Sequence, residues 1–255
     1  MRKKILYVFF IVMVLTASVC KILSILDASP KDKDAGKSDE SKIIIEKRNA
    51  TQDENEKLKI YKTVYLTFDD GPSKNTYKVL DILKQNNIKA TFFVIGTNIT
   101  GEYEGLLREM EGRGHIIGIH TFSHKYNYIY TNANNYIEDF NMAYNQLTGI
   151  LNNTPSIYRF PGGSCICYIG SNKSLIVDEL KARGFTYYDW QVSGEDSVGK
   201  PTKEEIINNV LKDVDDFDNP IILLHDSSIN GNTVEALPGI IRGLKERGYE
   251  FGVLK

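Results

Sequence analysis

Residues 64–72 read VYLTFDDGP, an apolar run that stops at two adjacent carboxylates and a Gly-Pro turn. The β-branched and aromatic residues predict a buried strand. Side chains alternate along a strand, so Asp69 and Asp70 can face one site only where the strand has begun to turn. Gly71 and Pro72 supply such a turn, although the same residues also fit an Asx turn that only caps the strand.

Composition excludes some classes of protein. The 255 residues are 42% hydrophobic and 25% charged, which is ordinary for a globular protein of one large or two small domains. A net charge of -2 without a basic cluster argues against nucleic acid as a partner. The three cysteines are too few for a disulfide framework. We expect Cys165 and Cys167 to be free thiols, because closing a disulfide across one residue is strained.

The N-terminal part predicts export. In residues 1–26 a basic flank precedes an apolar stretch of roughly the length that crosses a bilayer at about 1.5 Å per residue. No clean small-x-small cleavage site follows, so we expect a single-pass anchor in the cell membrane, with the rest of the chain outside. Secretion after signal cleavage is the alternative. Residues 27–57 are charged and polar and predict a flexible linker.

Residues 58–255 alternate short apolar runs with amphipathic segments, which predicts βα units around a parallel sheet. The predicted strands are 64–68, 90–95, 115–119, 156–160, 185–188, 220–224 and 249–254. The predicted helices lie near 79–83, 103–112, 134–151, 173–183, 202–214 and 234–247. Gly114, Gly184 and Gly248 stand where helix C-caps belong. A barrel of about seven strands and a doubly wound open sheet both fit this pattern.

Catalytic-type side chains follow the predicted strands at their carboxyl ends, where α/β barrels assemble active sites. They are Asp69, Asp70, His120, His124, Arg159, Asp189 and His225. Two histidines four residues apart can reach one metal from a helical turn, and one of the two aspartates completes a set of three ligands. The other aspartate is then free to act as a base. A histidine can instead satisfy a buried hydrogen bond, which is our interpretation of His115.

Five motifs occur in a fixed order along the chain: TFDDGP (67–72), HTFSH (120–124), RFPGG (159–163), DW (189–190) and LLHD (223–226). In these motifs the chain resembles the NodB-like polysaccharide deacetylases, carbohydrate esterase family 4. The resemblance implies a distorted (β/α) barrel of about seven parallel strands. It also implies metal-dependent removal of N-acetyl groups from the amino sugars of a polysaccharide.

The resemblance also assigns roles. Asp70, His120 and His124 would bind a divalent metal, zinc, that acidifies a water and polarises the acetyl carbonyl. Asp69 would be the general base, and Arg159 would orient it.

The remaining roles concern the oxyanion and the leaving group. The N–H of Gly162 would help the metal to hold the oxyanion. His225 would protonate the departing amine, and Asp189 would hydrogen-bond His225. Trp190 and Leu223 would line the acetyl pocket.

Two positions depart from the family pattern. Lys125 stands where many relatives have proline, and Gly162 stands where many have an aromatic residue. We expect both to widen or recharge the sugar groove and so to affect substrate preference.

Three alternatives accompany this interpretation. An exported domain would meet cell-wall peptidoglycan, but chitin-like oligomers or another surface polysaccharide also fit the motifs. A catalytically silent wall-binding protein would carry a broken motif, and none is broken. A glycosidase needs two carboxyls at least ~5 Å apart across the scissile bond, which adjacent residues in one turn would struggle to provide. The sequence indicates no protein partner.

Overall fold

The computed structural model describes residues 62–255. The predicted membrane anchor (1–26), the linker (27–57) and Cys20 lie outside the described residues. No helix between residues 62 and 255 is long and apolar enough to cross a membrane.

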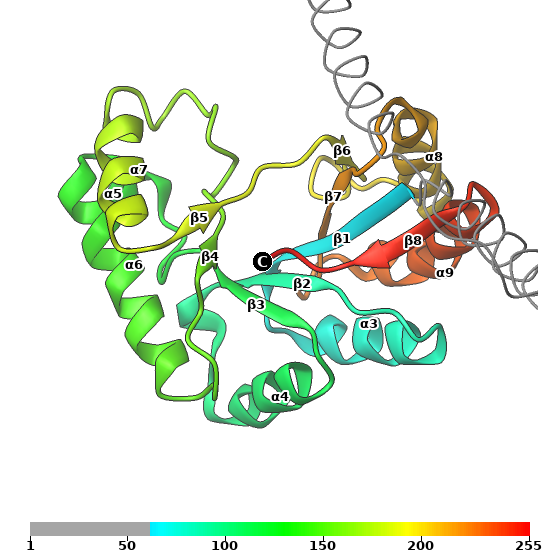
Figure 1. Cartoon of the computed structure of the whole chain (residues 1–255), viewed down its shortest axis with the longest axis horizontal. Helices are drawn as coiled ribbons and strands as arrows, with labels where there is room; N and C mark the ends of the chain where they lie inside the picture. Colours follow the sequence, from blue (N-terminus) through cyan, green and yellow to red (C-terminus); the bar gives the residue numbers. More distant parts are fainter. Residues whose placement is uncertain (1–61) are drawn as a thin grey trace, which may run out of the picture. The chain divides into compact units, whose positions relative to one another are not determined.

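The strands form one parallel sheet (Figure 1). Their bounds are β1 Lys62–Gly71, β2 Thr91–Val94, β3 Ile116–Ile119, β4 Ile157–Tyr158, β5 Thr186–Tyr187, β6 Val192–Ser193, β7 Ile221–His225 and β8 Tyr249–Gly252. The strand order is β5-β4-β3-β2-β1-β7-β6, and β8 pairs with β1. The sheet curls, but β5 and β6 end it without pairing with each other in the described part of the chain, so it is a partial barrel.

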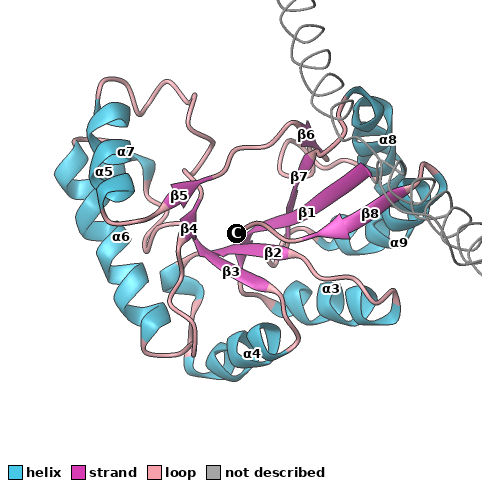
Figure 2. Ribbon diagram, in the orientation of Figure 1, coloured by secondary structure: helices cyan, strands magenta, loops and turns pink. Residues whose placement is uncertain are grey.

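Helices surround the curled sheet on its outside, as Figure 2 shows. They are α3 Lys74–Gln85, α4 Gly101–Gly112, α5 Tyr126–Ile129, α6 Ala133–Thr148, α7 Asn172–Ala182, α8 Lys203–Asp213 and α9 Gly231–Glu246, with the 3-10 turns η1 Gly96–Asn98 and η2 Val214–Asp216. Gly114, Gly184 and Gly248 have φ values of 80°, 88° and 79°, which confirms the predicted left-handed residues after α4, α7 and α9.

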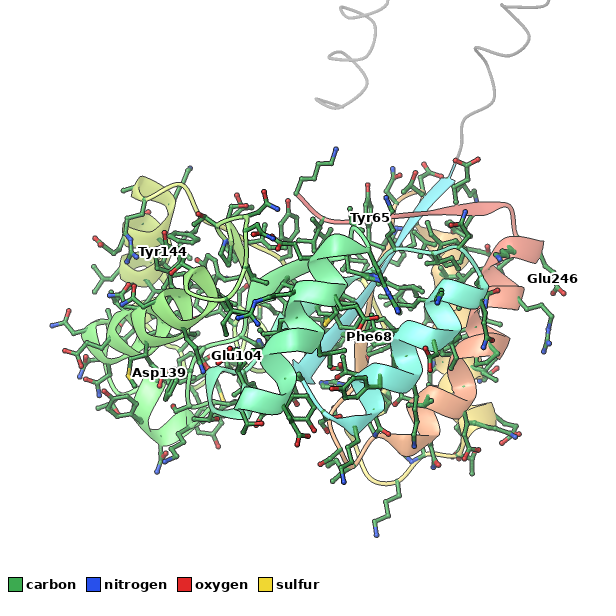
Figure 3. The ribbon with its side chains drawn as sticks, turned by 90° about the horizontal axis from the view of Figure 1, so that it is seen from below. Tyr65, Phe68, Glu104, Asp139, Tyr144 and Glu246 are labelled. Carbon is green, nitrogen blue, oxygen red and sulfur yellow. The ribbon has the colours of Figure 1, made fainter. Side chains whose placement is uncertain are left out.

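β1 is the central strand of the sheet. One of its sides pairs with β7, and the other pairs first with β8 along residues 62–65 and then with β2 from Thr67 onward. Val64, Leu66 and Phe68 on β1 are fully buried. The ring of Phe68 stacks on Phe92 of β2 at 5.1 Å between centroids, and Figure 3 shows Phe68 in the interior of the domain. Each such large apolar side chain stabilises the fold by about 1.5–3 kcal/mol when buried.

All seven predicted strands and all six predicted helices are present. The sequence did not predict β6 or α5. β6 is no shorter than β4 and β5, but those two lie within the longer predicted runs 156–160 and 185–188, whereas Val192 and Ser193 of β6 stand between Gln191 and Gly194. α5 is a single helical turn and is too short to show a hydrophobic period.

Candidate active site

The end of β1 brings both aspartates into one site. The pairing of β1 with β2 shifts register between Asp69 and Gly71, and Asp70 has a φ of 71°. This irregularity cancels the alternation of a regular strand, so two adjacent carboxylates face the same side. Gly71 packs tightly against Asp226, since a Cβ on Gly71 would lie 2.7 Å from both carboxylate oxygens of Asp226. The expected turn at the strand end is confirmed.

The loop after β3 carries His120 and His124. It is not the helical turn that their spacing suggested, because Thr121 and His124 have φ values of 66° and 55°. These left-handed residues fold the loop back, so that the two imidazole centroids lie 5.0 Å apart.

Neighbouring elements hold this loop in place. The backbone N–H groups of Phe122 and Ser123 donate to Oδ1 of buried Asp139 on α6 at 2.5 and 3.0 Å. On the other side, the N–H of Gly96 donates to the carbonyl of Thr121 at 3.1 Å. Two elements that are distant in sequence, η1 and α6, therefore fix the path of the loop that carries the two histidines.

Asp70, His120 and His124 fit a divalent metal. Asp70 Oδ1 lies 3.5 Å from His120 Nε2 and 3.4 Å from His124 Nε2. Tetrahedral coordination with bonds of about 2.0–2.2 Å separates neighbouring ligand atoms by about 3.3–3.6 Å. Asp70 Oδ1 is buried and has no hydrogen-bond partner within residues 62–255, as expected of an oxygen placed for a cation. The three ligand atoms lie within 4.8 Å of one another.

The protonation of His120 also suits a metal ligand. Its Nδ1 lies 2.9 Å from the carbonyl oxygen of Arg159, to which it donates, so Nε2 is left with a free lone pair. Burial, followed by the charge of His124, lowers the pKa of His120 to about 3. His120 is therefore a neutral imidazole, the form that binds metals.

Arg159 holds Asp69. Its guanidinium is fully buried, and Nη1 donates to Asp69 Oδ1 at 2.9 Å and to Thr67 Oγ1 at 2.7 Å. Burial raises the pKa of Asp69, while the charges of Arg159 and then His225 oppose that rise. Asp69 is thus an oriented carboxylate with a pKa above its usual value, which is a property of general bases. The predicted contact between Arg159 and this aspartate is confirmed.

The partner of His225 is Asp196, and the hydrogen bond predicted from Asp189 is wrong. Asp196 Oδ1 lies 2.8 Å from His225 Nδ1, and Asp196 Oδ2 accepts from the backbone N–H of His225 at 2.8 Å. Thr233 Oγ1 also donates to Asp196 Oδ2 at 2.7 Å. Burial alone would lower the pKa of His225, but the hydrogen bond and charge of Asp196 raise it to about 9.

Sequence reasoning missed Asp196 because it follows β6, the strand that the sequence did not predict. When β6 is not predicted, nothing in the sequence distinguishes Asp196 from its exposed neighbour Glu195, because both then lie in a polar loop. The sequence feature that could have identified Asp196 is the pair Val192-Ser193, a short extended segment that ends shortly before the Asp196 carboxylate.

Asp189 instead anchors the turn of the RFPGG motif. Its carboxylate accepts from the backbone N–H of Ser164 at 2.8 Å and from the Ser164 hydroxyl at 2.5 Å. Lys173 Nζ donates to the same hydroxyl at 2.9 Å. The backbone carbonyl of Asp189 accepts from Arg159 Nη2 at 3.3 Å.

The predicted substrate-binding residues border this centre. Gly162 has a φ of 77° in the turn after Pro161. The half-buried ring of Trp190 lies beside Gly163 and 5.6 Å from the guanidinium carbon of Arg159. Leu223 lies on β7 opposite Thr67 and is 6% exposed. The acetyl pocket predicted for Trp190 and Leu223 stays a prediction.

Residues away from this centre behave as predicted. Cys165 and Cys167 are free and exposed, as expected. His115 is buried, and its Nδ1 accepts from the N–H of Ala90 at 3.1 Å, which agrees with a structural role.

Comparisons with known proteins agree with this geometry. Residues 57–188 match the polysaccharide deacetylase family. A peptidoglycan-N-acetylglucosamine deacetylase of Bacillus cereus is 33% identical over 199 residues, which cover 74% of this chain and 68% of that relative.

Solved structures show the same fold. The catalytic domain of a peptidoglycan N-acetylglucosamine deacetylase from Eubacterium rectale superposes with a TM-score of 0.71 at 37% identity, covering 76% of this chain and 89% of that one. A Streptococcus mutans CE4 esterase superposes with a TM-score of 0.70 at 32% identity, covering 76% and 86%. The chain belongs to the polysaccharide deacetylases, the NodB-like hydrolases of carbohydrate esterase family 4.

Proposed function

We propose that this protein is a divalent-metal-dependent deacetylase that removes N-acetyl groups from the amino sugars of cell-wall peptidoglycan. The observation that carries the proposal is the set of Asp70, His120 and His124 at tetrahedral ligand spacing, beside a second carboxylate that Arg159 holds. Two imidazole nitrogens and one carboxylate oxygen are donors that suit zinc. A metal bound there would act as a Lewis acid and polarise the acetyl carbonyl.

The residues of the chain supply the proton transfers. Asp69 takes a proton from the attacking water, because Arg159 fixes its carboxylate and burial raises its pKa. His225 gives a proton to the departing amine, and the hydrogen bond from Nδ1 to Asp196 turns Nε2 away from that carboxylate. The N–H of Gly162 donates to the oxygen on which negative charge develops.

Peptidoglycan is the favoured substrate because the similar proteins from Bacillus cereus and Eubacterium rectale are named peptidoglycan N-acetylglucosamine deacetylases. An anchor at residues 1–26 would place the domain outside the cell membrane, next to that glycan. Chitin-like oligomers or another surface polysaccharide are the second candidate. The intact set of metal-ligand and acid–base side chains counts against a silent wall-binding protein.

The test is mass spectrometry of purified peptidoglycan fragments after incubation with the zinc-loaded protein. We expect an acetyl group to be lost from N-acetylglucosamine, and a chelator to stop the reaction. If no wall glycan loses acetate while chitin oligomers do, the peptidoglycan assignment is wrong.

The role of Asp69 is tested by Asp69→Asn. The amide keeps the size of the side chain but cannot take a proton, so we expect turnover to fall by about 10²–10⁴-fold. Zinc content, measured on the same preparations, should stay close to that of the wild type. Full activity of Asp69→Asn with zinc bound would contradict the assignment of the base.

A further inference from the structure

One hydroxyl at the active site has no role in the proton transfers. Tyr126, in the first turn of α5, is half-buried, and its ring lies edge-on to His124 at 5.4 Å between centroids. Its hydroxyl makes no hydrogen bond to any residue from 62 to 255. The hydroxyl of its neighbour Tyr130, by contrast, donates to the carbonyl of Pro161 at 2.7 Å. A polar atom beside a metal ligand is therefore free to bind a ligand.

Tyr126 also occupies the space beside Gly162. A Cβ on Gly162 would lie 2.9 Å from Tyr126 Oη and would also contact Ile166 Cδ1 too closely. The missing side chain at position 162 therefore does not widen the groove as we had expected. Tyr126 and Ile166 fill the place that a side chain at position 162 would take.

The direction of the Tyr126 hydroxyl limits what it can bind. It lies on the side of Gly162 where a Cβ would stand. The N–H of a residue, by contrast, leaves the backbone from the nitrogen and lies in the peptide plane. The two donors therefore serve different parts of a substrate. If the N–H of Gly162 donates to the acetyl oxygen, the hydroxyl of Tyr126 faces the sugar that carries the acetamido group.

An exposed aromatic ring extends this surface. Tyr168 is 63% exposed, and its ring lies edge-on to Tyr126 at 5.9 Å. Two amphipathic rings side by side, one of them open to solvent, suit a ligand with apolar faces and a rim of hydroxyl groups. A pyranose sugar has this character.

We infer that Tyr126 is a substrate-binding residue whose hydroxyl hydrogen-bonds the ring of the N-acetylated amino sugar beside Gly162. The inference rests on the proposed function for the identity of the sugar. Because the contact is made to a part of the substrate that does not react, it strengthens binding of the ground state and the transition state alike.

The test compares Tyr126→Phe with Tyr128→Phe. The first change removes the hydroxyl and keeps the ring contacts with His124 and Tyr168. The second removes the hydroxyl of a 40% exposed tyrosine on the same helix and is the matched control. Zinc content and the circular dichroism spectrum of each variant show that the metal site and the fold are unchanged.

The measurements are binding of a soluble N-acetylglucosamine oligomer by calorimetry and release of acetate from it. For Tyr126→Phe we expect binding to weaken and KM to rise by about fivefold with kcat unchanged, as for loss of one neutral hydrogen bond. Tyr128→Phe should match the wild type within about twofold.

Each other outcome is informative. Wild-type binding by Tyr126→Phe, or no binding of the oligomer by the wild type, would overturn the inference. A fall in kcat with KM unchanged would also overturn it, since the hydroxyl would then act on the transition state. If the wild type binds the oligomer but releases no acetate, deacetylation of this sugar fails while the binding comparison still decides the role of Tyr126.

Discussion

The imidazole of His225 is subject to two opposing influences. Burial favours its neutral form, while the hydrogen bond and charge of Asp196 favour the protonated form and raise the pKa of His225 to about 9. An acid with that pKa keeps its proton through neutral pH and loses it only in the alkaline range. The alkaline limb of the activity profile should therefore report on this pair.

Asp196→Asn removes the charge and keeps the shape of the side chain. We expect the alkaline limb of kcat/KM to move to lower pH by about one to two units. Initial rates between pH 6 and about 10 check this. Glu195→Gln, at the exposed neighbouring residue, is the control and should leave the limb in place. If the alkaline limb of kcat/KM stays at the same pH in Asp196→Asn, a group other than the His225–Asp196 pair determines that limb.

The free energy of unfolding should also depend on pH through the raised pKa of His225. Since the folded pKa of His225 is raised above 6.5, its stabilising contribution is fully present below about pH 6.5 and is lost as pH rises through about 9. The destabilisation by Asp196→Asn, measured by denaturant unfolding, should thus be largest below pH 6.5 and should shrink above pH 9.

Single residues also show what the sequence could predict. The positions of Asp69, Asp70 and Arg159 at strand ends were predictable because each follows an apolar run that predicts a strand. The partner of His225 was not, because the choice between Asp189 and Asp196 depends on β6, whose Val192 and Ser193 lie in no longer apolar run. A hydrogen bond between two loops depends on the backbone path of each loop. A single sequence does not determine these paths.

Among the larger elements, the loop 120–124 depends on helix α6. The carboxylate of Asp139 accepts from two consecutive backbone N–H groups of this loop, so it fixes the path that returns His124 to His120. Asp139 is 1% exposed and lies on α6. Figure 3 labels its side chain. This helix thereby positions His120 and His124, two of the proposed metal ligands.

Asp139→Asn should weaken zinc binding by on the order of tenfold, as loss of outer contacts to ligand-bearing segments does. A neutral amide oxygen is a poorer acceptor for two N–H groups than a carboxylate. Competition with a fluorescent chelator measures the affinity directly. Glu138→Gln, at an exposed position of the same helix, should keep wild-type affinity. Equal affinities in the two variants would show that the loop holds its shape without Asp139.

Elements of ordinary length were predictable from sequence. α3, α6 and α9 each bury one apolar face, and the strands β1 and β7 are continuous apolar runs, so their patterns are clear. The loop of the two histidines was not predictable. Its spacing fits a helical turn equally well, and only contacts from η1 and α6 select the left-handed conformations at Thr121 and His124.

Considered as a whole, the domain should become more stable when the metal binds. The three proposed ligands come from β1 and from the loop after β3, so an ion bound there would join segments 50 residues apart in the sequence. At a free zinc concentration about a hundred times Kd, the gain is about 2.7 kcal/mol, or about 5–10 °C in Tm for a domain of this size.

Differential scanning calorimetry with and without zinc measures this gain. His120→Ala should lose it, whereas Asp178→Asn, an exposed change on α7, should retain it. An equal rise in Tm for wild type and His120→Ala would place the stabilising zinc elsewhere on the protein.

The length of β1 separates the first described residue of the domain from its catalytic edge. Lys62 begins the strand and Asp69 stands near its other end, about 23 Å away along an extended chain. Lys62 therefore lies at the end of β1 opposite the catalytic edge. A surface that held the domain at Lys62 itself would leave the catalytic edge on the far side, where a polymer too large to diffuse could still reach it.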